Sequence, residues 1–176
     1  TFINSTGYTS ANAQIIVLPG GTFVLDSTTI SGCAFMWPGI TLDTTARMLM
    51  KKGSELRDAN NGIHALHPSY VEVAGSRIYD CVRGIYTPPF AGISTSQVIV
   101  HGSKIGLDAS AFKQNYQGQP QHGLIPKAGV EINNMVMTLG GSGQRNEFFK
   151  LNTGIVSNNS FLTVKNSEFR NVGYDT

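Results

Sequence analysis

Two aspartates and an arginine have the spacing that most suggests chemistry. Asp58 and Asp80 each stand two residues after the apolar residue that closes a strand-like phrase, and four residues before the glycine of a Gly-Ile pair. If these phrases stack, the two carboxylates lie on adjacent turns of the chain, where a close pair can bind Ca²⁺ or share a proton. Arg83 follows and can hold an anionic substrate. The three residues are therefore candidates for acid-base cleavage of a polysaccharide.

The equivalent position in the other repeats argues against a cation site. Its occupants there are not acidic: they are Gly32, Leu107, Lys150 and Asn171. Because no third carboxylate joins the pair, we expect no metal and no cofactor, with Ca²⁺ between Asp58 and Asp80 as the alternative. We expect both aspartates to be solvated turn residues.

A second set of polar side chains follows the Gly-Ile and Gly-Val pairs. Two residues after each glycine, where side chains should face outward, the sequence has Thr41, His64, Tyr86, Glu131 and Val156. The neighbouring outward row has Asp43, Asn133 and Asn158. An aromatic face beside planar hydrogen-bonding groups suits a pyranose ring. The candidate ligand-binding residues are His64, Tyr86, Glu131 and Asn133, although a sheet surface that binds nothing has a similar composition.

An internal repeat must position these residues. A glycine followed by Ile or Val recurs at Gly39, Gly62, Gly84, Gly129 and Gly154, which gives a period of about 22 residues with one longer interval. Between these pairs lies a phrase of alternating apolar residues, a small polar turn and a further apolar residue, as in Val71 to Ile78 and Leu162 to Phe169. Such short alternation indicates half-buried strands, and no window has the spacing of an amphipathic helix.

Short strands repeated at this period predict an all-β fold, a right-handed parallel β-helix. We expect about six coils of about 22 residues, without substantial helices, stacked at the spacing of neighbouring strands. The segment 108–127 lacks alternation and contains amides and two prolines, so it is a lateral loop insertion. The ends carry no distinct cap, so we expect residues 1–176 to be one β-helix segment of a longer chain, with further coils as neighbours.

The two cysteines are expected to be free and buried. Cys33 and Cys81 each follow, by three residues, the apolar residue that ends a phrase, a position expected to face inward. On that placement they are two coils apart, roughly 9.6 Å at the strand spacing, whereas a disulfide needs Cα atoms within about 6.8 Å.

Charge and hydropathy exclude several classes of partner. The 13 basic and 11 acidic residues are spread along the chain, without a run of one sign. We therefore expect no nucleic-acid binding. No apolar stretch approaches the roughly 20 residues that span a bilayer, so we expect no membrane insertion.

Several motifs resemble a known group of repeats. They are Phe35-Met36-Trp37-Pro38-Gly39-Ile40, the Gly-Ser-x-Leu-Arg-Asp-Ala segment at 53–59, Asn61-Gly62-Ile63 and Asn166-Ser167-x-Phe169-x-Asn171. They resemble the right-handed β-helix repeats of large secreted bacterial surface proteins, many of which carry a type IX secretion sorting domain. The resemblance covers Ile15 to Gly173 and implies a pectate-lyase-like fold and export. Lyases, adhesins and tailspikes share such repeats, so the activity stays open.

Three functions are compatible with these observations. The first is a non-catalytic scaffold or adhesin segment of a secreted or cell-surface bacterial protein, with a surface for extracellular polysaccharide. The second is a polysaccharide lyase or glycoside hydrolase that uses Asp58, Asp80 and Arg83 with the 108–127 loop. The third is an exported cargo protein held by secretion machinery. The missing acidic neighbours of the aspartate pair favour the first.

Overall fold

The computed structural model describes residues 1–66, 68–92, 95–109, 112–113, 125–141 and 143–173. Within these residues the fold is all-β, and three parallel sheets coil into a β-solenoid of about six turns, as the repeat predicted. One turn takes about 25 residues rather than the predicted 22, because some turns carry longer connections between strands, as between Gly32 and Trp37 or between Tyr86 and Gln97. No helix of the described residues is long and apolar enough to cross a membrane.

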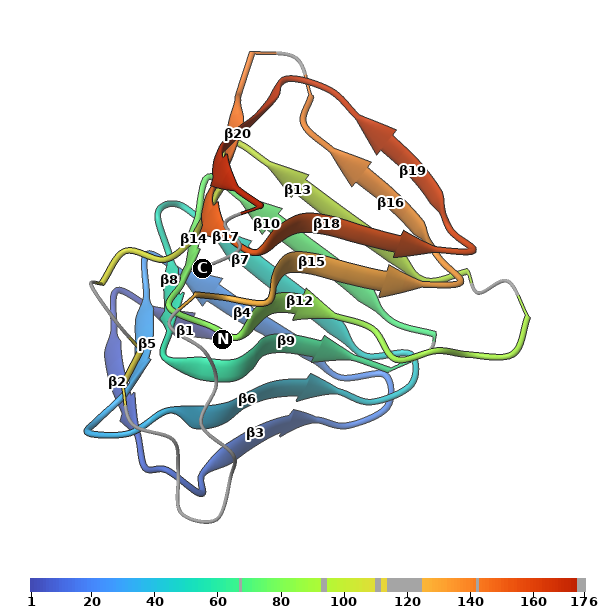
Figure 1. Ribbon diagram of the computed structural model, residues 1–176. Coiled ribbons are helices and arrows are strands. Elements are labelled where there is room, and N and C mark those ends of the chain that lie inside the picture. Colours follow the sequence, from blue (N-terminus) through green and yellow to red (C-terminus); the bar gives the residue numbers. More distant parts are fainter. Residues whose placement is uncertain (67, 93–94, 110–111, 114–124, 142, 174–176) are drawn as a thin grey trace.

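Each turn contributes one strand to each sheet (Figure 1). Sheet A contains β1 (Phe2–Ile3), β4 (Thr22–Asp26), β7 (Arg47–Lys51), β10 (Tyr70–Ala74), β13 (Gln97–His101), β16 (Val136–Leu139) and β19 (Phe161–Val164). Sheet B contains β2 (Thr6–Thr9), β5 (Thr29–Gly32), β8 (Glu55–Arg57), β11 (Arg77–Tyr79), β14 (Lys104–Gly106), β17 (Asn146–Leu151) and β20 (Ser167–Val172). Sheet C contains β3 (Gln14–Val17), β6 (Trp37–Leu42), β9 (Ala59–Ala65), β12 (Arg83–Tyr86), β15 (Ala128–Asn133) and β18 (Thr153–Asn158).

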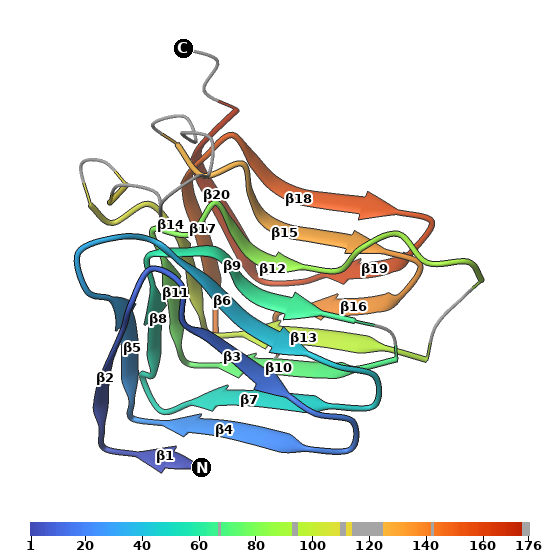
Figure 2. The same ribbon diagram turned by 90° about the horizontal axis from the view of Figure 1, so that it is seen from below.

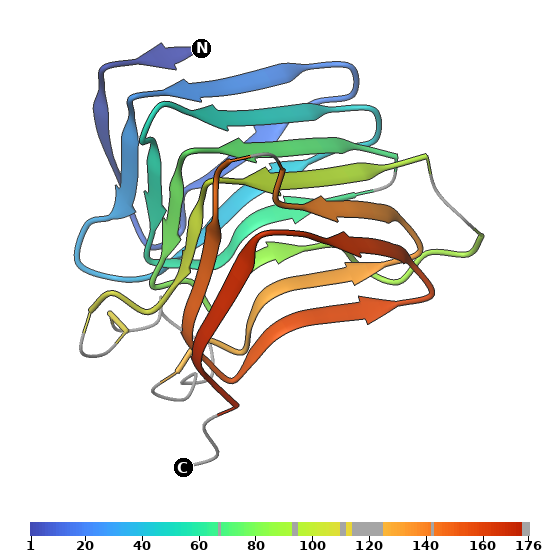
Figure 3. The same ribbon diagram turned by 90° about the horizontal axis from the view of Figure 1, so that it is seen from above.

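The core lies between the three sheets and consists of stacked apolar columns. Figures 2 and 3, seen from below and from above, show the sheets around this common interior. The column of sheet A is Leu25, Met50, Val73, Val100 and Leu139. The column of sheet B is Ile30, Leu56, Ile78, Ile105 and Phe148. The column of sheet C is Ile40, Ile63, Ile85 and Val130. All are buried, because alternate residues of each strand face inward.

Close packing between turns requires the glycine of each Gly-Ile pair in sheet C. A Cβ atom on Gly62 would lie 2.6 Å from the carbonyl oxygen of Gly84, and one on Gly84 would lie 2.5 Å from that of Gly129. Successive turns therefore approach too closely at this column for any side chain. The repeat that marks sheet C in the sequence is a packing requirement.

The corner between sheets B and C needs a left-handed backbone conformation in most turns. Asp58, Asp80, Lys150 and Asn171 occupy equivalent places there, with φ between 50° and 59°. Asn and Asp tolerate this conformation better than other residues with a Cβ atom. The sequence alignment of this column is therefore confirmed, and an aspartate there has a structural reason to be present.

The prediction for the cysteines is partly wrong. Both are free thiols and Cys81 is buried, but Cys33 is exposed. Trp37, and not Cys33, pairs with Ala59, because residues 33–36 form an extra connection between β5 and β6. That connection also leaves Phe35 41% exposed, whereas Trp37 is completely buried in the core.

The predicted insertion lies between two strands. β14 ends at Gly106 and β15 begins at Ala128. Of the predicted loop 108–127, the structure describes residues 108–109, 112–113 and 125–127, and the rest lies outside the described residues.

Candidate functional site

Sheet C places the predicted ligand-binding column in one outward row. Thr41, His64, Tyr86, Glu131 and Val156 are paired across consecutive strands. Each of these side chains is half-buried, whereas their neighbours Ile63, Ile85 and Val130 face the core. The alternation of β-strands therefore gives a short polar and aromatic row on the outside of a rigid sheet. We call His64, Tyr86 and Glu131, with Asn61 and Arg83 beside them, the sheet C strip.

An aromatic stack and an ion pair hold this strip together. The rings of His64 and Tyr86 are stacked, with centroids 5.2 Å apart and an interplanar angle of 26°. The Arg83 guanidinium lies 4.8 Å from the centroid of the Tyr86 ring, and its Nε donates to Glu131 Oε2 at 2.7 Å. Lys127 Nζ lies 3.4 Å from the same oxygen. Burial alone would raise the pKa of Glu131, but Arg83 and Lys127 hold it below its usual value.

Two polar atoms of the strip have no partner. Asn61 Oδ1 and His64 Nε2 are buried without a hydrogen bond. Asn61 lies next to Arg83 in the sheet and beside the bulge where the register between β6 and β9 shifts. Burial, and then the charge of Arg83, lowers the pKa of His64 below its ordinary value. Burial therefore favours the neutral form of the His64 imidazole. Each orphaned atom lacks about 1–3 kcal/mol of hydrogen-bond compensation.

Asn133 does not face outward as expected. It is buried at the corner between sheets C and A. Its Nδ2 donates to the carbonyl oxygen of Thr87 at 2.6 Å, and its Oδ1 accepts from Asn158 Nδ2 at 3.0 Å. Its amide therefore satisfies the backbone of the corner, as buried polar groups must, and it does not belong to the strip.

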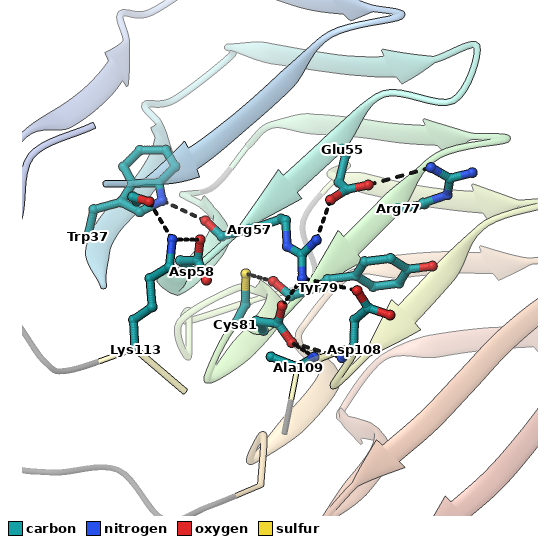
Figure 4. A network of polar contacts seen from close by, with 12 residues as sticks. Trp37, Glu55, Arg57, Asp58, Arg77, Tyr79, Cys81, Asp108, Ala109 and Lys113 are labelled. Carbon is teal, nitrogen blue, oxygen red and sulfur yellow. Dashed lines mark hydrogen bonds and ion pairs between the residues drawn. The ribbon is translucent and has the colours of Figure 1, made fainter. Parts of the chain in front are cut away.

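The two aspartates lie close together at the corner of sheets B and C, but they are not solvated. Asp58 is 4% exposed and Asp80 is 1% exposed. The expectation of solvated turn residues is wrong, because ion pairs and the first residues of the 108–127 segment cover this corner (Figure 4). We call Asp58 and Asp80 the aspartate corner.

Asp80 anchors the start of the insertion. Its Oδ1 accepts hydrogen bonds from the backbone N–H groups of Asp108 at 2.8 Å and Ala109 at 3.0 Å. Its Oδ2 accepts from the Arg57 guanidinium, which also donates to Glu55 at 2.9 Å. Both carboxylate oxygens are therefore occupied by charge-assisted or backbone hydrogen bonds.

Asp58 holds a later point of the same insertion. Lys113 Nζ donates to Asp58 Oδ2 at 2.8 Å and also to the carbonyl oxygen of Gly32 at 2.6 Å. Burial raises the pKa of Asp58, and the hydrogen bond from Lys113 opposes that rise. The insertion that leaves the solenoid after β14 is thus tied back to two earlier turns.

Arg83 does not join the aspartates. It is paired with Glu131 on sheet C, and the basic partners of the aspartate corner are Arg57 and Lys113. Sequence reasoning missed both. Arg57 was detectable from the sequence, because it lies between the inward Leu56 and Asp58 and alternation turns it outward. Its neighbour in the sheet is Tyr79. Lys113 comes from a segment without a repeat pattern, so its sequence does not show which turn of the solenoid it lies beside.

The arrangement limits the chemistry available at the aspartate corner. Each carboxylate has its own cation, so neither is free to act as a base without breaking an ion pair. Among the described residues no group of three or more His, Cys, Asp or Glu side chains is placed to hold a metal ion. The sheet C strip, by contrast, has unsatisfied polar atoms beside an aromatic ring. In comparisons with known proteins, no family model, no curated protein and no solved structure matches this chain.

Proposed function

We propose that this chain is a non-catalytic β-helix scaffold, part of a secreted or cell-surface protein, that binds a neutral glycan on the sheet C strip. The observation that carries the proposal is the stacked His64–Tyr86 pair with its unpartnered neighbours, His64 Nε2 and Asn61 Oδ1. These residues stand on consecutive strands of a rigid sheet, which costs little ordering on binding.

The chemistry of the strip suits sugar hydroxyl groups. A pyranose ring presents an apolar face and hydroxyls at its edge. The outward ring edges of the His64–Tyr86 stack supply the apolar contact, since His64 is stacked on the Tyr86 ring and Arg83 lies over it. Asn61 Oδ1 accepts hydrogen bonds only, and a sugar hydroxyl can donate one. The orphaned atoms have almost no accessible surface, so a ligand reaches them only after a side-chain shift.

The charges of the strip favour a neutral sugar over an acidic one. Arg83 and Lys127 are both compensated by Glu131. An acidic sugar would meet the Glu131 carboxylate and the Asn61 carbonyl oxygen, which repel it. Hydroxyl groups have no such cost.

The contacts of the aspartate corner support binding rather than cleavage. A glycosidase needs one carboxyl group as acid and a second as base or nucleophile. Here Asp80 is held by Arg57 and two backbone N–H groups, and Asp58 is held by Lys113. The pair is used to position the insertion.

We further propose that a coil of the same chain stacks on the end face formed by β18, β19 and β20. Leu162, Val164 and Phe169 continue the inward columns, yet they are 39%, 44% and 43% exposed. Apolar columns and unpaired strand backbone at one end are templates for another parallel strand layer. Sedimentation velocity tests whether this exposed end face binds another layer of strands. The 176-residue chain should self-associate, and Leu162→Lys should reduce the self-association. A monomer at all concentrations would contradict it.

Binding is tested by calorimetric titration with a panel of neutral oligosaccharides. Tyr86→Ala should weaken the best ligand at least about tenfold, since it removes the apolar contact of the aromatic ring, and burying an aromatic side chain is worth about 1.5–3 kcal/mol. Tyr8→Ala is the matched control, because Tyr8 is 72% exposed on the first turn, away from the strip. Equal affinities in the two variants, or no binding by the unaltered chain, would overturn the proposal.

A further inference from the structure

A shallow groove lies at the corner where sheet C passes into sheet A. It has a volume of about 420 Å³ and is formed by three successive turns, at residues 45–47, 68–70 and 95–97. In the sheet Tyr70 pairs with Arg47 on one side and with Gln97 on the other. The groove is therefore built on the edge of a rigid sheet, and it shares no lining residue with the sheet C strip.

An aromatic ring and polar side chains line the groove. The Arg47 guanidinium lies 4.9 Å from the centroid of the Tyr70 ring. The Tyr70 hydroxyl donates to Glu72 Oε2 at 2.8 Å, which fixes the ring along the strand. Gln97 adds an exposed amide at the other side. This combination of an aromatic ring, a guanidinium and an amide provides one apolar contact and several donors.

A buried hydroxyl in the groove has no partner. Ser69 is 5% exposed, and its Oγ makes no hydrogen bond. The equivalent serines at another corner behave differently, since Ser76 Oγ donates to the carbonyl oxygen of Ala74 at 2.9 Å. A buried unpaired hydroxyl costs free energy unless another group supplies the missing bond. The Ser69 oxygen has almost no accessible surface, so a ligand in the groove reaches it only after a small side-chain shift.

The charge of the groove is uncompensated. Arg47 has no carboxylate within ion-pair distance in the described part of the chain, unlike Arg57, Arg77 and Arg83. None of the described residues that line the groove is acidic, and the nearby Glu72 carboxylate is bound to the Tyr70 hydroxyl. A free guanidinium presents a planar fork of donors that matches a carboxylate or a sulfate.

We propose that this groove is a second binding site and that it takes a saccharide unit with an anionic group. The acid group pairs with Arg47, the sugar hydroxyls bond to Ser69 and Gln97, and the sugar ring lies against Tyr70. The site does not depend on the sheet C strip. The two sites divide the ligands by charge, with neutral sugars on the strip and acidic sugars in the groove.

The test is calorimetric titration of the full chain with an oligouronate, a sulfated oligosaccharide and a neutral oligosaccharide of equal length. The oligouronate, the sulfated oligosaccharide or both should bind. Comparison of their affinities tells whether a carboxylate or a sulfate fits the site. Arg47→Gln should weaken acidic binding at least about tenfold, because it removes the charge-assisted fork. Arg145→Gln is the matched control, since Arg145 is also exposed but is paired with Glu168.

Ser69→Ala separates binding from folding. It removes the orphaned hydroxyl, so the free energy of unfolding should stay the same or rise, while affinity for the acidic ligand falls several-fold. Tyr86→Ala should leave acidic binding unchanged, so failure of the strip proposal is distinguishable from failure here. Absence of acidic binding, equal binding of the neutral ligand, or full affinity in Arg47→Gln would overturn the groove proposal.

Discussion

The two residues of the aspartate corner should differ sharply when each is changed to asparagine. They occupy equivalent places in adjacent turns and share a left-handed backbone conformation, which asparagine adopts readily. Asp80 is 1% exposed and paired with an Arg57 side chain that is itself only 27% exposed. Asp58 is paired with Lys113, whose side chain is 37% exposed. The two substitutions therefore have the same backbone cost, and they differ in how deeply the broken ion pair is buried.

The expected magnitudes follow from burial. Breaking a buried ion pair by removing one partner costs about 3–5 kcal/mol. Arg57 keeps Glu55 and Asp108 as partners and reaches some solvent, so Asp80→Asn should cost about 2–3 kcal/mol. Lys113 is more exposed than Arg57, so the Asp58 pair lies nearer the range of about 0–1 kcal/mol that exposed pairs contribute, although Asp58 itself is buried. Asp58→Asn should therefore cost less than about 1 kcal/mol, and it also relieves the burial that raises the pKa of Asp58.

Equilibrium urea unfolding at pH 7 measures both costs. Asp80→Asn should move the midpoint to lower urea without a change in slope, and Asp58→Asn should move it little. The N–H groups of residues 108 and 109 should gain hydrogen exchange in Asp80→Asn, because that carboxylate holds them. Equal losses in the two variants, or a larger loss for Asp58→Asn, would refute the role assigned to burial at this corner.

Three further outcomes follow from the fold. Gly106→Ala should destabilise the fold by about 1–3 kcal/mol or more, because the new Cβ would lie 2.1 Å from a backbone carbonyl oxygen. Gly141→Ala is the control, because a Cβ there meets open space. A small difference between the urea midpoints of the two variants would contradict this. Burial lowers the pKa of His64 in the folded state, so the stability linked to the neutral imidazole is present above pH 6.5 and is lost as the pH falls through the pKa of the folded state. In His64→Gln the free energy of unfolding should depend less on pH over that window. An unchanged pH dependence would count against this role of His64. A thiol reagent should modify Cys33 and spare Cys81, whose pKa is raised by burial, so rapid reaction of two thiols in the folded state would be incompatible with the structure.

Much of the fold was predictable because the repeat is a packing requirement. The Gly-Ile pairs mark places where turns approach too closely for a Cβ atom, so they show the register of sheet C directly. The outward row through His64 and Tyr86 followed from that register and strand alternation. The aspartate column was located equally well, because a left-handed corner constrains the sequence in most turns.

Features outside the repeat were not predictable. The extra connection at 33–36 moved Trp37 into the place assigned to Cys33. The burial of the aspartates depends on Arg57 and Lys113, and Lys113 comes from a segment whose sequence has no period. The groove at Arg47 and Tyr70 joins residues from three turns whose corner sequences share no pattern. Register follows from periodicity, whereas contacts across corners depend on the side chains of each connection.

Mass spectrometry of a bound oligosaccharide distinguishes binding from cleavage. The neutral oligosaccharide that binds best is incubated for a long period with an equal amount of the chain, and its mass and bound fraction are then measured. If the chain is a binding scaffold, the sugar stays intact and its binding is lost in Tyr86→Ala. Shortened products that disappear in Asp58→Asn would contradict it and would show that the aspartate corner performs catalysis.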